Sequence, residues 1–202
     1  MSEPDALTRA GTAETARKAI HAAAGGGAAA VAWIAPPSVA RAVLLFAVLI
    51  ALATELLRLR VPAVRRRFDS TLGRMLRPGE RRSLTGATTL AIGAALAVLL
   101  FPGRVAAIGI LYAAFGDAAA ALVGRRFGRQ IYRPGRTVEG TAAFFAVCLL
   151  IGLAVPGAGV LAATAAAAAV TFVEAAPLPV NDNLLIPVAG AAACRWVMVL
   201  PV

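Results

Sequence analysis

The sequence predicts an all-α integral membrane protein, a polytopic helical bundle of about seven transmembrane helices with its N-terminus in the cytoplasm. The first observation is compositional: of 202 residues, 60% are hydrophobic and 15% charged, with a mean hydropathy of +0.80. Soluble domains are about 45–50% apolar and about 25% charged, so an ordinary soluble domain is excluded. The second observation is that the apolar residues fall into runs about as long as a bilayer-spanning helix requires.

Seven such runs are separated by proline, glycine or charged residues. We expect spans near 20–35, 39–57, 84–101, 105–124, 141–156, 158–175 and 184–200. The first is the weakest, because Ala22–Ala30 contains only alanine and glycine, and six spans is therefore the alternative count. The chain is accordingly divided into a polar cytoplasmic segment, 1–15, and a single transmembrane domain, 16–202, with basic cytoplasmic loops near 58–83 and 125–140.

The net charge of +10 comes from twenty basic and ten acidic residues. Seventeen of the twenty basic residues precede the first span or lie in the two long loops, and seven spans place all of them on one side. Because basic loops stay in the cytoplasm, this arrangement predicts a multi-pass protein of the plasma (inner) membrane whose polar site faces the cytoplasm. Topology accounts for the arginines, so nucleic acid is not an expected partner. Only Arg41, Arg104 and Arg195 are left for the opposite side.

Four acidic residues lie at or near membrane depth in the cytoplasmic half, where ionisable groups are costly and usually functional. Asp117 is the clearest, because Gly116 and alanines around it leave room for a ligand or a metal. Glu174 and Asp182 lie near the next cytoplasmic boundary. Glu55 is explained equally well by an ion pair with Arg58, three residues further along the same helix.

The loop sequence GRRFGRQIYRPGRTVEGT (124–141) has the chemistry of an anion site. Arginine guanidinium groups match phosphate oxygens, and glycines free backbone amides as further donors. Asp117 and Glu139, one on each side of the basic stretch, are candidates to hold Mg²⁺ on the same phosphates. The alternative is that these arginines bind anionic lipid headgroups and fix the topology.

Five blocks, in order, resemble the CTP-dependent lipid-alcohol kinases, the family of dolichol kinase, phytol kinase and yeast-type diacylglycerol kinase. They are ARKAIHAAAG (16–25), ERRSLTGATT (80–89), FGDAAAALVGRRFGR (115–129), RTVEGT (136–141) and PVNDNLLIP (179–187). The resemblance covers most of the chain. It implies phosphoryl transfer from CTP, or another nucleoside triphosphate, to a membrane lipid alcohol: a polyprenol, a phytol-like isoprenoid or diacylglycerol.

Two positions depart from the family pattern. Arg136 stands where lysine is usual, and Asn181 stands where the first of two aspartates is common, which puts a two-carboxylate metal site in that loop in doubt. The rival family is the CDP-diacylglycerol synthase type of cytidylyltransferase, which is similar in the Gly-Asp core and the Lys-Thr-x-Glu-Gly block. Its His-Gly-Gly motif is absent here, since the only histidine is His21. A small transporter with Asp117 as its ion site is the alternative from another class, but the two halves show no internal repeat.

The resemblance implies a role for each candidate. Asp117 is a Mg²⁺ ligand or the base for the lipid hydroxyl, with Glu139 and Asp182 as further metal ligands. Arg17 and Lys18 act with Asp117 in catalysis and clamp phosphates. The remaining nucleotide- or phosphate-binding candidates are His21, Gly116, Gly124, Arg125, Arg136, Thr137, Gly140 and Asn183, and the further acidic candidates are Glu55, Glu80 and Glu174. The oligomeric state is not predicted.

Overall fold

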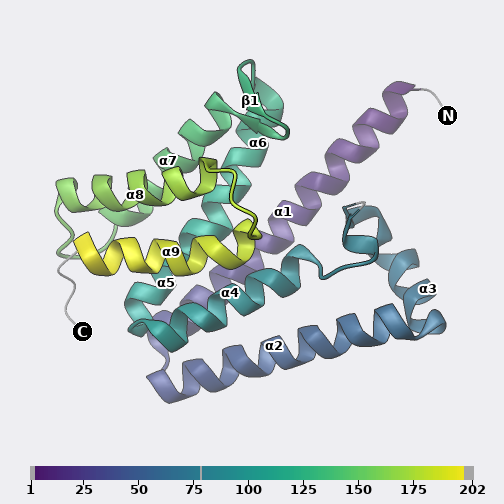
Figure 1. Ribbon diagram of the computed structural model, residues 1–202, viewed down its shortest axis with the longest axis horizontal. Coiled ribbons are helices and arrows are strands. Elements are labelled where there is room, and N and C mark those ends of the chain that lie inside the picture. Colours follow the sequence, from purple (N-terminus) through teal and green to yellow (C-terminus); the bar gives the residue numbers. More distant parts are fainter. Residues whose placement is uncertain (1–2, 78, 198–202) are drawn as a thin grey trace.

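A computed structural model describes residues 3–77 and 79–197 (Figure 1). The helices are α1 (Glu3–Ile34), α2 (Pro37–Arg60), α3 (Pro62–Thr71), α4 (Gly86–Leu100), α5 (Gly103–Leu111), α6 (Asp117–Phe127), α7 (Val138–Leu153), α8 (Val160–Ala175) and α9 (Asp182–Val197). Short 3-10 turns cover Gly73–Met75 and Gly79–Arg81, and a small antiparallel hairpin pairs β1 (Ile131–Arg133) with β2 (Arg136–Thr137). The predicted all-α class is confirmed.

Each predicted span falls on a helix. Helices α4 and α8 are three and two residues shorter than their apolar runs, whereas α1, α2 and the continuous helix Gly103–Phe127 are longer than theirs. Among the described residues, two helices are long and apolar enough to cross a membrane by length and composition, Pro37–Arg60 and the continuous helix Gly103–Phe127. The apolar helices α4, α7 and α8 have 15 or 16 residues. Part of the difference lies in the helix ends: the run 84–101 gives a helix only over 86–100, because Thr85 is its N-cap. The seven-span arrangement thus stays a prediction, and the end of its last span, 198–200, lies outside the described residues.

Helix α1 crosses the boundary that the sequence suggested at residue 15. It runs from Glu3 to Ile34 without interruption, although Gly11 and three threonines before residue 16 are poor helix formers. Arg17 and Glu14 add an i,i+3 ion pair, with the guanidinium 2.5 and 2.8 Å from the carboxylate oxygens. The polar N-terminal segment is therefore the first part of the same helix that carries the predicted first span.

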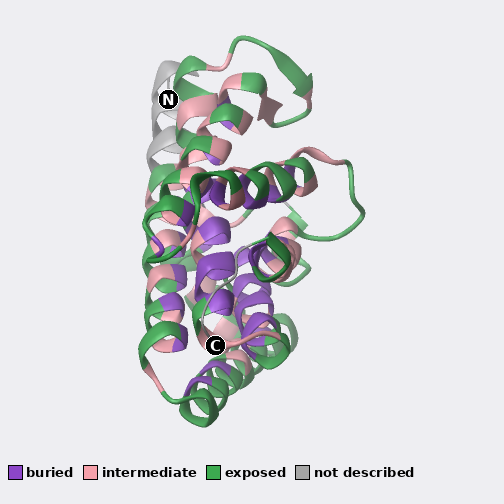
Figure 2. Ribbon diagram, turned by 90° about the vertical axis from the view of Figure 1, so that its left-hand side faces the viewer, coloured by how far each residue is buried: buried purple, intermediate pink, exposed green. Residues whose placement is uncertain are grey.

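Buried residues gather at the centre of the bundle (Figure 2), and small residues let the helices approach closely there. A Cβ atom on Gly25 of α1 would lie 2.4 Å from the Ala114 side chain. A Cβ atom on Gly109 of α5 would lie 2.1 Å from the Pro187 carbonyl oxygen of α9. Small residues at helix crossings permit this close approach of two backbones. The core therefore depends on glycine at these crossings, and large buried side chains such as Tyr112 and Phe144 fill the space beside them.

A π-helical turn, Tyr112–Gly116, joins α5 to α6 within one continuous helix. Such turns insert an extra residue and occur often at functional sites. Here the turn ends directly before Asp117, the first residue of α6.

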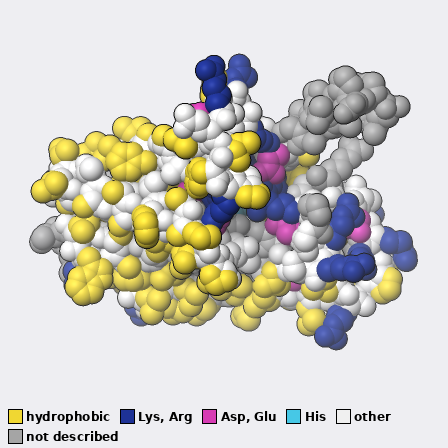
Figure 3. Space-filling model, turned by 45° about the horizontal axis from the view of Figure 1, so that its top comes forward, with side chains coloured by type: hydrophobic (Ala, Val, Ile, Leu, Met, Phe, Trp, Pro, Cys, Tyr) yellow, Lys and Arg dark blue, Asp and Glu magenta, His cyan; other side chains and the backbone are white. Residues whose placement is uncertain are grey.

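Large apolar side chains remain exposed over much of the surface. On α2 alone, Phe46 and Leu49 are each 64% exposed, and Leu56 is 56% exposed. In Figure 3 apolar side chains dominate the left and lower surface, whereas most charged side chains lie at the top centre, the centre and the right. Monomeric soluble proteins rarely expose apolar areas of such extent.

Candidate functional site

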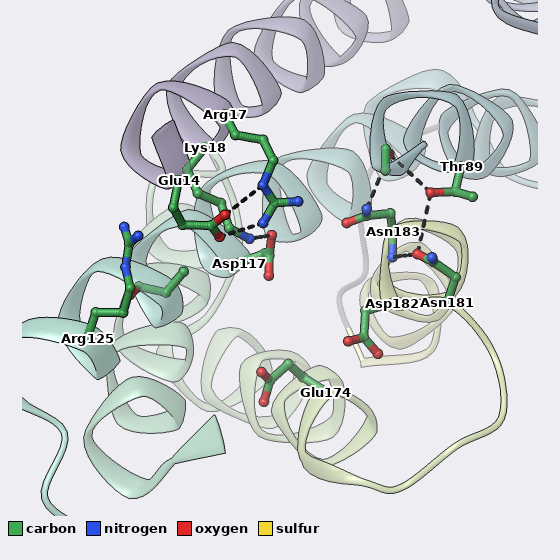
Figure 4. Close-up of polar contacts among 12 residues, drawn as sticks. Glu14, Arg17, Lys18, Thr89, Asp117, Arg125, Glu174, Asn181, Asp182 and Asn183 are labelled. Atoms are coloured by element: carbon green, nitrogen blue, oxygen red, sulfur yellow. Dashed lines mark hydrogen bonds and ion pairs between the residues drawn. The ribbon is translucent and has the colours of Figure 1, made fainter. Parts of the chain in front are cut away.

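A polar cleft of about 950 Å³ opens between α1, α6, the hairpin and the loop that leads into α9. Figure 4 shows side chains from α1, α6, α8 and α9 around this space. Its charged lining side chains are Glu14, Arg17, Lys18, Arg77, Asp117, Arg125, Arg133, Arg136, Glu174 and Asp182. Six cationic groups therefore face four carboxylates, and the excess of positive charge favours an anionic ligand.

Lys18 of α1 donates to Asp117 Oδ2 of α6 on the wall of this cleft. The lysine side chain is 4% exposed and the aspartate side chain 17%. Burial lowers the pKa of the Lys18 ammonium below its ordinary value, and the negative charge of Asp117 opposes that shift. The pair fixes α1 against α6 and presents a carboxylate to the cleft.

Arg136 of β2 connects three separate elements. Its guanidinium is ion-paired with Glu174 at the end of α8 and with Asp182 at the start of α9. Glu174 is only 1% exposed, so this buried carboxylate depends on Arg136 for charge compensation. The hairpin, α8 and α9 are thus held at one side of the cleft by a single guanidinium.

Three further arginines line the cleft, and their guanidinium groups have no ion pair with a carboxylate among the described residues. Arg125 donates to the Ala121 carbonyl oxygen at 3.1 Å, and Arg133 donates to the Ala176 carbonyl oxygen at 2.8 Å. The side chain of Arg77 lies in the same wall. These donors can bind phosphate oxygens without first breaking an ion pair.

His21 is the one buried imidazole in the cleft wall. It is 9% exposed, and its Nε2 has no hydrogen-bond partner among the described residues. A buried polar atom without a partner costs free energy, so a ligand in the cleft is a natural source of the missing hydrogen bond.

The structure brings most of the predicted site residues together. Those that line the cleft are Arg17, Lys18, His21, Asp117, Gly124, Arg125, Arg136, Thr137, Gly140, Glu174, Asp182 and Asn183. They come from positions 17 to 183, so the fold, not sequence proximity, gathers them. Four candidates do not line it: Gly116, Glu55, Glu80 and Glu139.

Glu55 and Glu80 support the loop between α3 and α4. Glu55 is ion-paired with Arg58 and accepts hydrogen bonds from the Thr85 amide at 2.9 Å and the Thr88 hydroxyl at 3.0 Å. Glu80 accepts from the Gly86 amide at 3.0 Å, at the N-terminus of α4. The predicted alternative for Glu55, an i,i+3 ion pair, is confirmed.

Glu139 also bonds to backbone instead of facing the cleft. Its carboxylate accepts from the Arg129 amide at 3.0 Å and the Gln130 amide at 3.4 Å. Thr137 is the N-cap of α7, because its hydroxyl oxygen accepts from the Gly140 amide at 3.0 Å. Both residues thereby shape the connection between α6 and α7.

The glycines predicted for the site lie where two segments of the chain are in close contact. A Cβ atom on Gly116 would lie 2.8 Å from the Phe144 ring, and one on Gly140 would lie 2.8 Å from the Ala120 carbonyl oxygen. A Cβ atom on Gly124 would lie 2.9 Å from the Thr137 hydroxyl oxygen. Close approach was the reason for proposing them, but the atoms approached belong to the protein itself.

Asn183 ties α9 to α4 at the edge of the cleft. Its side-chain amide donates to the Gly86 carbonyl oxygen at 3.2 Å, and Asn181 Oδ1 accepts from the Asn183 amide at 3.0 Å. Thr89 also donates to Asn181 Oδ1, at 3.4 Å (Figure 4). Residues 80–89 therefore contact residues 179–187 directly. Glu80, the acidic residue of the first block, does not line the cleft.

The carboxylates of the cleft are spread over its walls. No group of three or more His, Cys, Asp or Glu side chains in the described part of the chain is placed to hold a metal ion. The ion pairs use Oδ2 of Asp117 and Oδ2 of Asp182, which leaves one oxygen of each carboxylate for a ligand. Such a set suits Mg²⁺ carried by phosphates, because that ion commonly takes one or two carboxylates together with phosphate oxygens.

Three charged residues that line the cleft, Glu14, Arg77 and Arg133, are not predicted from the sequence. Glu14 had a usable signal, its i,i+3 spacing to Arg17. Arg133 lies in the predicted basic loop, where no local signal distinguishes it from the other arginines. Arg77 is one of nine arginines between Arg58 and Arg82, and no local signal separates it from the others.

Comparison with protein-family models, with curated proteins and with solved structures finds no match to this chain. The fold and the cleft therefore define it only as an all-helical protein with a charged cleft that is rich in arginine.

Proposed function

We propose that this chain is a membrane-embedded lipid kinase that transfers the γ-phosphoryl group of CTP, or another nucleoside triphosphate, to the hydroxyl of a lipid alcohol at the cytoplasmic face. The observation that carries the proposal is the cleft, where residues from four of the five family-like blocks meet and the fifth reaches its edge through Gly86 and Asn183. The preference for CTP and the lipid alcohols comes from the resemblance alone.

The proposal includes seven spans with a cytoplasmic N-terminus. The exposed apolar side chains of α2 support it, as do α8 residues such as Leu161 and Phe172, which are 84% and 76% exposed. Lipid is the environment in which such surfaces are stable. Basic clusters around the cleft would then face the cytoplasm, where the nucleotide is found.

In the proposed reaction the lipid hydroxyl oxygen attacks the γ-phosphorus, and the bond from that phosphorus to the β,γ-bridging oxygen breaks. The nucleoside diphosphate leaves with that electron pair, and the hydroxyl proton passes to a base. The chain's part is positioning and neutralisation of charge. Arg77, Arg125 and Arg133 offer donors for phosphate oxygens, and Lys18 places a cation beside them.

Asp117 has two candidate roles, acceptor of the hydroxyl proton or ligand of Mg²⁺. Its ion pair with Lys18 favours the charged carboxylate, which both roles require. If Mg²⁺ enters with the nucleotide, Asp117 and Asp182 would hold it, and it would neutralise charge on the phosphates. His21 Nε2, without a partner in the described structure, is placed to donate to a phosphate oxygen or to accept from the ligand.

The test is a matrix of nucleoside triphosphates against lipid alcohols, with the purified chain in lipid nanodiscs and label on the γ-phosphate. Transfer of label to the lipid is expected, and Asp117→Asn should reduce it by at least about a hundredfold. Asp69→Asn is the matched control, because Asp69 lies on α3 away from the cleft. Release of pyrophosphate with formation of a CDP-lipid would replace the kinase with the cytidylyltransferase. Label transfer that persists in Asp117→Asn would refute the role of Asp117.

A further inference from the structure

A second cleft, of about 570 Å³, lies at the far end of the same helices. It is bounded by the C-terminal ends of α1, α4 and α9 and by the first residues of α2 and α5. The first cleft lies along α1 near Lys18 and along α9 near Asn183, whereas this one lies near Trp33 and Arg195. The two clefts are therefore separated along the helix axes.

Three arginines line this second cleft: Arg41 of α2, Arg104 of α5 and Arg195 of α9. They are the only three basic residues of the chain outside its three cytoplasmic clusters. Arginine on the non-cytoplasmic side runs against the usual distribution in membrane proteins. Because they converge on one cleft from three helix ends, these three cations need an anionic partner that balances their charge.

That partner is not a carboxylate of the same stretches. Residues 22–54, 81–116 and 183–202, which supply the walls, contain no Asp or Glu. Among the described residues, Arg41 donates to the Val98 carbonyl oxygen, at 3.3 Å, and the Arg104 guanidinium lies 5.9 Å from the centre of the Trp33 ring. The cleft thus holds three cations, and their protein contacts within the described structure add no negative charge.

We propose that this cleft binds the phosphate of an anionic phospholipid headgroup in the non-cytoplasmic leaflet. Guanidinium groups suit phosphate oxygens, and on the cytoplasmic side of membranes basic pockets between transmembrane helices bind anionic headgroups. The same chemistry applies to a basic pocket in the opposite leaflet. The rim is apolar: Ile34 is 80% exposed and Leu100 is 63% exposed, so acyl chains can lie beside it. A tryptophan at the headgroup level is typical of the membrane interface. The proposal needs the membrane placement but not the kinase activity.

Trp33 gives a direct reporter, because the chain has only one other tryptophan, Trp196, which is 87% exposed and does not line the cleft. In a Trp196→Phe background of the full chain in neutral detergent micelles, Trp33 emission is followed during titration with short-chain phosphatidylglycerol. Parallel titrations use phosphatidylcholine with the same acyl chains and inorganic phosphate. A saturable change with phosphatidylglycerol alone is expected.

The Arg41→Gln, Arg104→Gln, Arg195→Gln triple variant should weaken this binding by more than about a hundredfold, at about fivefold for each arginine. The matched control replaces Arg65, Arg66 and Arg67 of α3, which are exposed and outside both clefts, by glutamine; it should bind as tightly as the parent. Arg195→Gln alone, with an expected loss of about fivefold, tests the same point if the triple variant does not fold. Equal responses to phosphatidylcholine and phosphatidylglycerol, or undiminished affinity in the variants, would overturn the site. A response to inorganic phosphate with the same midpoint would overturn the assignment to lipid.

Discussion

Lys18 and Asp117 form an ion pair although 99 residues separate them in the chain. The contact joins the helix that carries the polar N-terminal segment to the helix that follows the π turn. It also places a cation and a carboxylate side by side on the wall of the larger cleft.

Loss of either partner should destabilise the protein, because the other charge would be left nearly buried. We expect Lys18→Met and Asp117→Asn each to lower the free energy of unfolding by about 3 kcal/mol. The double variant should lose less than the sum of the two. Thermal unfolding in detergent micelles measures this coupling. Lys18→Met combined with Asp69→Asn is the control pair, which should be additive, and additivity of the Lys18 and Asp117 variants would contradict the pairing.

The glycine at the crossing of α5 and α9 should not tolerate a methyl group. A Cβ atom on Gly109 would meet the Pro187 carbonyl oxygen at 2.1 Å and the Ala191 amide nitrogen at 2.5 Å, both backbone atoms. Gly109→Ala is expected to cost about 1–3 kcal/mol through overpacking. Gly27→Ala is the comparison, because a Cβ there meets nothing within 4 Å and should stabilise α1 by about 0.5–1 kcal/mol. Equal shifts of the unfolding temperature in the two variants would show that the crossing is looser than described.

The loop before α4 should detach when Arg58 is replaced. Arg58 is 1% exposed and donates to the Ser83 carbonyl oxygen at 2.7 Å and the Glu80 carbonyl oxygen at 3.1 Å, besides its ion pair with Glu55. Arg58→Leu would leave Glu55 buried without its counter-charge. Limited trypsin digestion should then cleave within 77–82 several-fold faster than in the parent. Arg60→Leu, an exposed arginine two residues further on, should leave the digestion rate unchanged.

Protonation of Glu139 should loosen the turn between α6 and β1. The pKa of this carboxyl group is held below its ordinary value of 4.5 by hydrogen bonds, first from its own backbone amide and then from those of Arg129 and Gln130. Its contribution to stability is therefore present above about pH 4.5 and is lost as the pH falls through the lowered value. The Arg129 amide resonance of protein labelled with 15N-arginine should shift in that acidic range. Glu139→Gln should abolish this titration, and a midpoint at or above pH 4.5 in the parent would contradict the hydrogen bonds.

The gathering of Asp117, Lys18 and Arg136 in one cleft was expected from the sequence, because the predicted spans put the three blocks that contain them on the same side. The hydrogen bonds of Glu55 and Glu139 with backbone amides could not be predicted, because no local sequence pattern indicates which amides a carboxylate will contact after folding. The start of α1 at Glu3 lies well before the predicted span 20–35, because the hydropathy of residues 3–15 does not indicate a helix. The other helix ends differ from the predicted spans by a few residues, since hydropathy does not indicate a capping residue such as Thr85.

The π-helical turn at Tyr112–Gly116 determines the direction in which the side chains of α6 point around the helix axis. One residue rotates an α-helix by about 100°, so removal of a single alanine from this turn would swing Asp117 away from Lys18 while Gly109 still faced α9. Composition, charge and helicity would hardly change. The electrostatic character of the larger cleft therefore depends on the number of residues in an apolar segment as well as on the charged residues themselves.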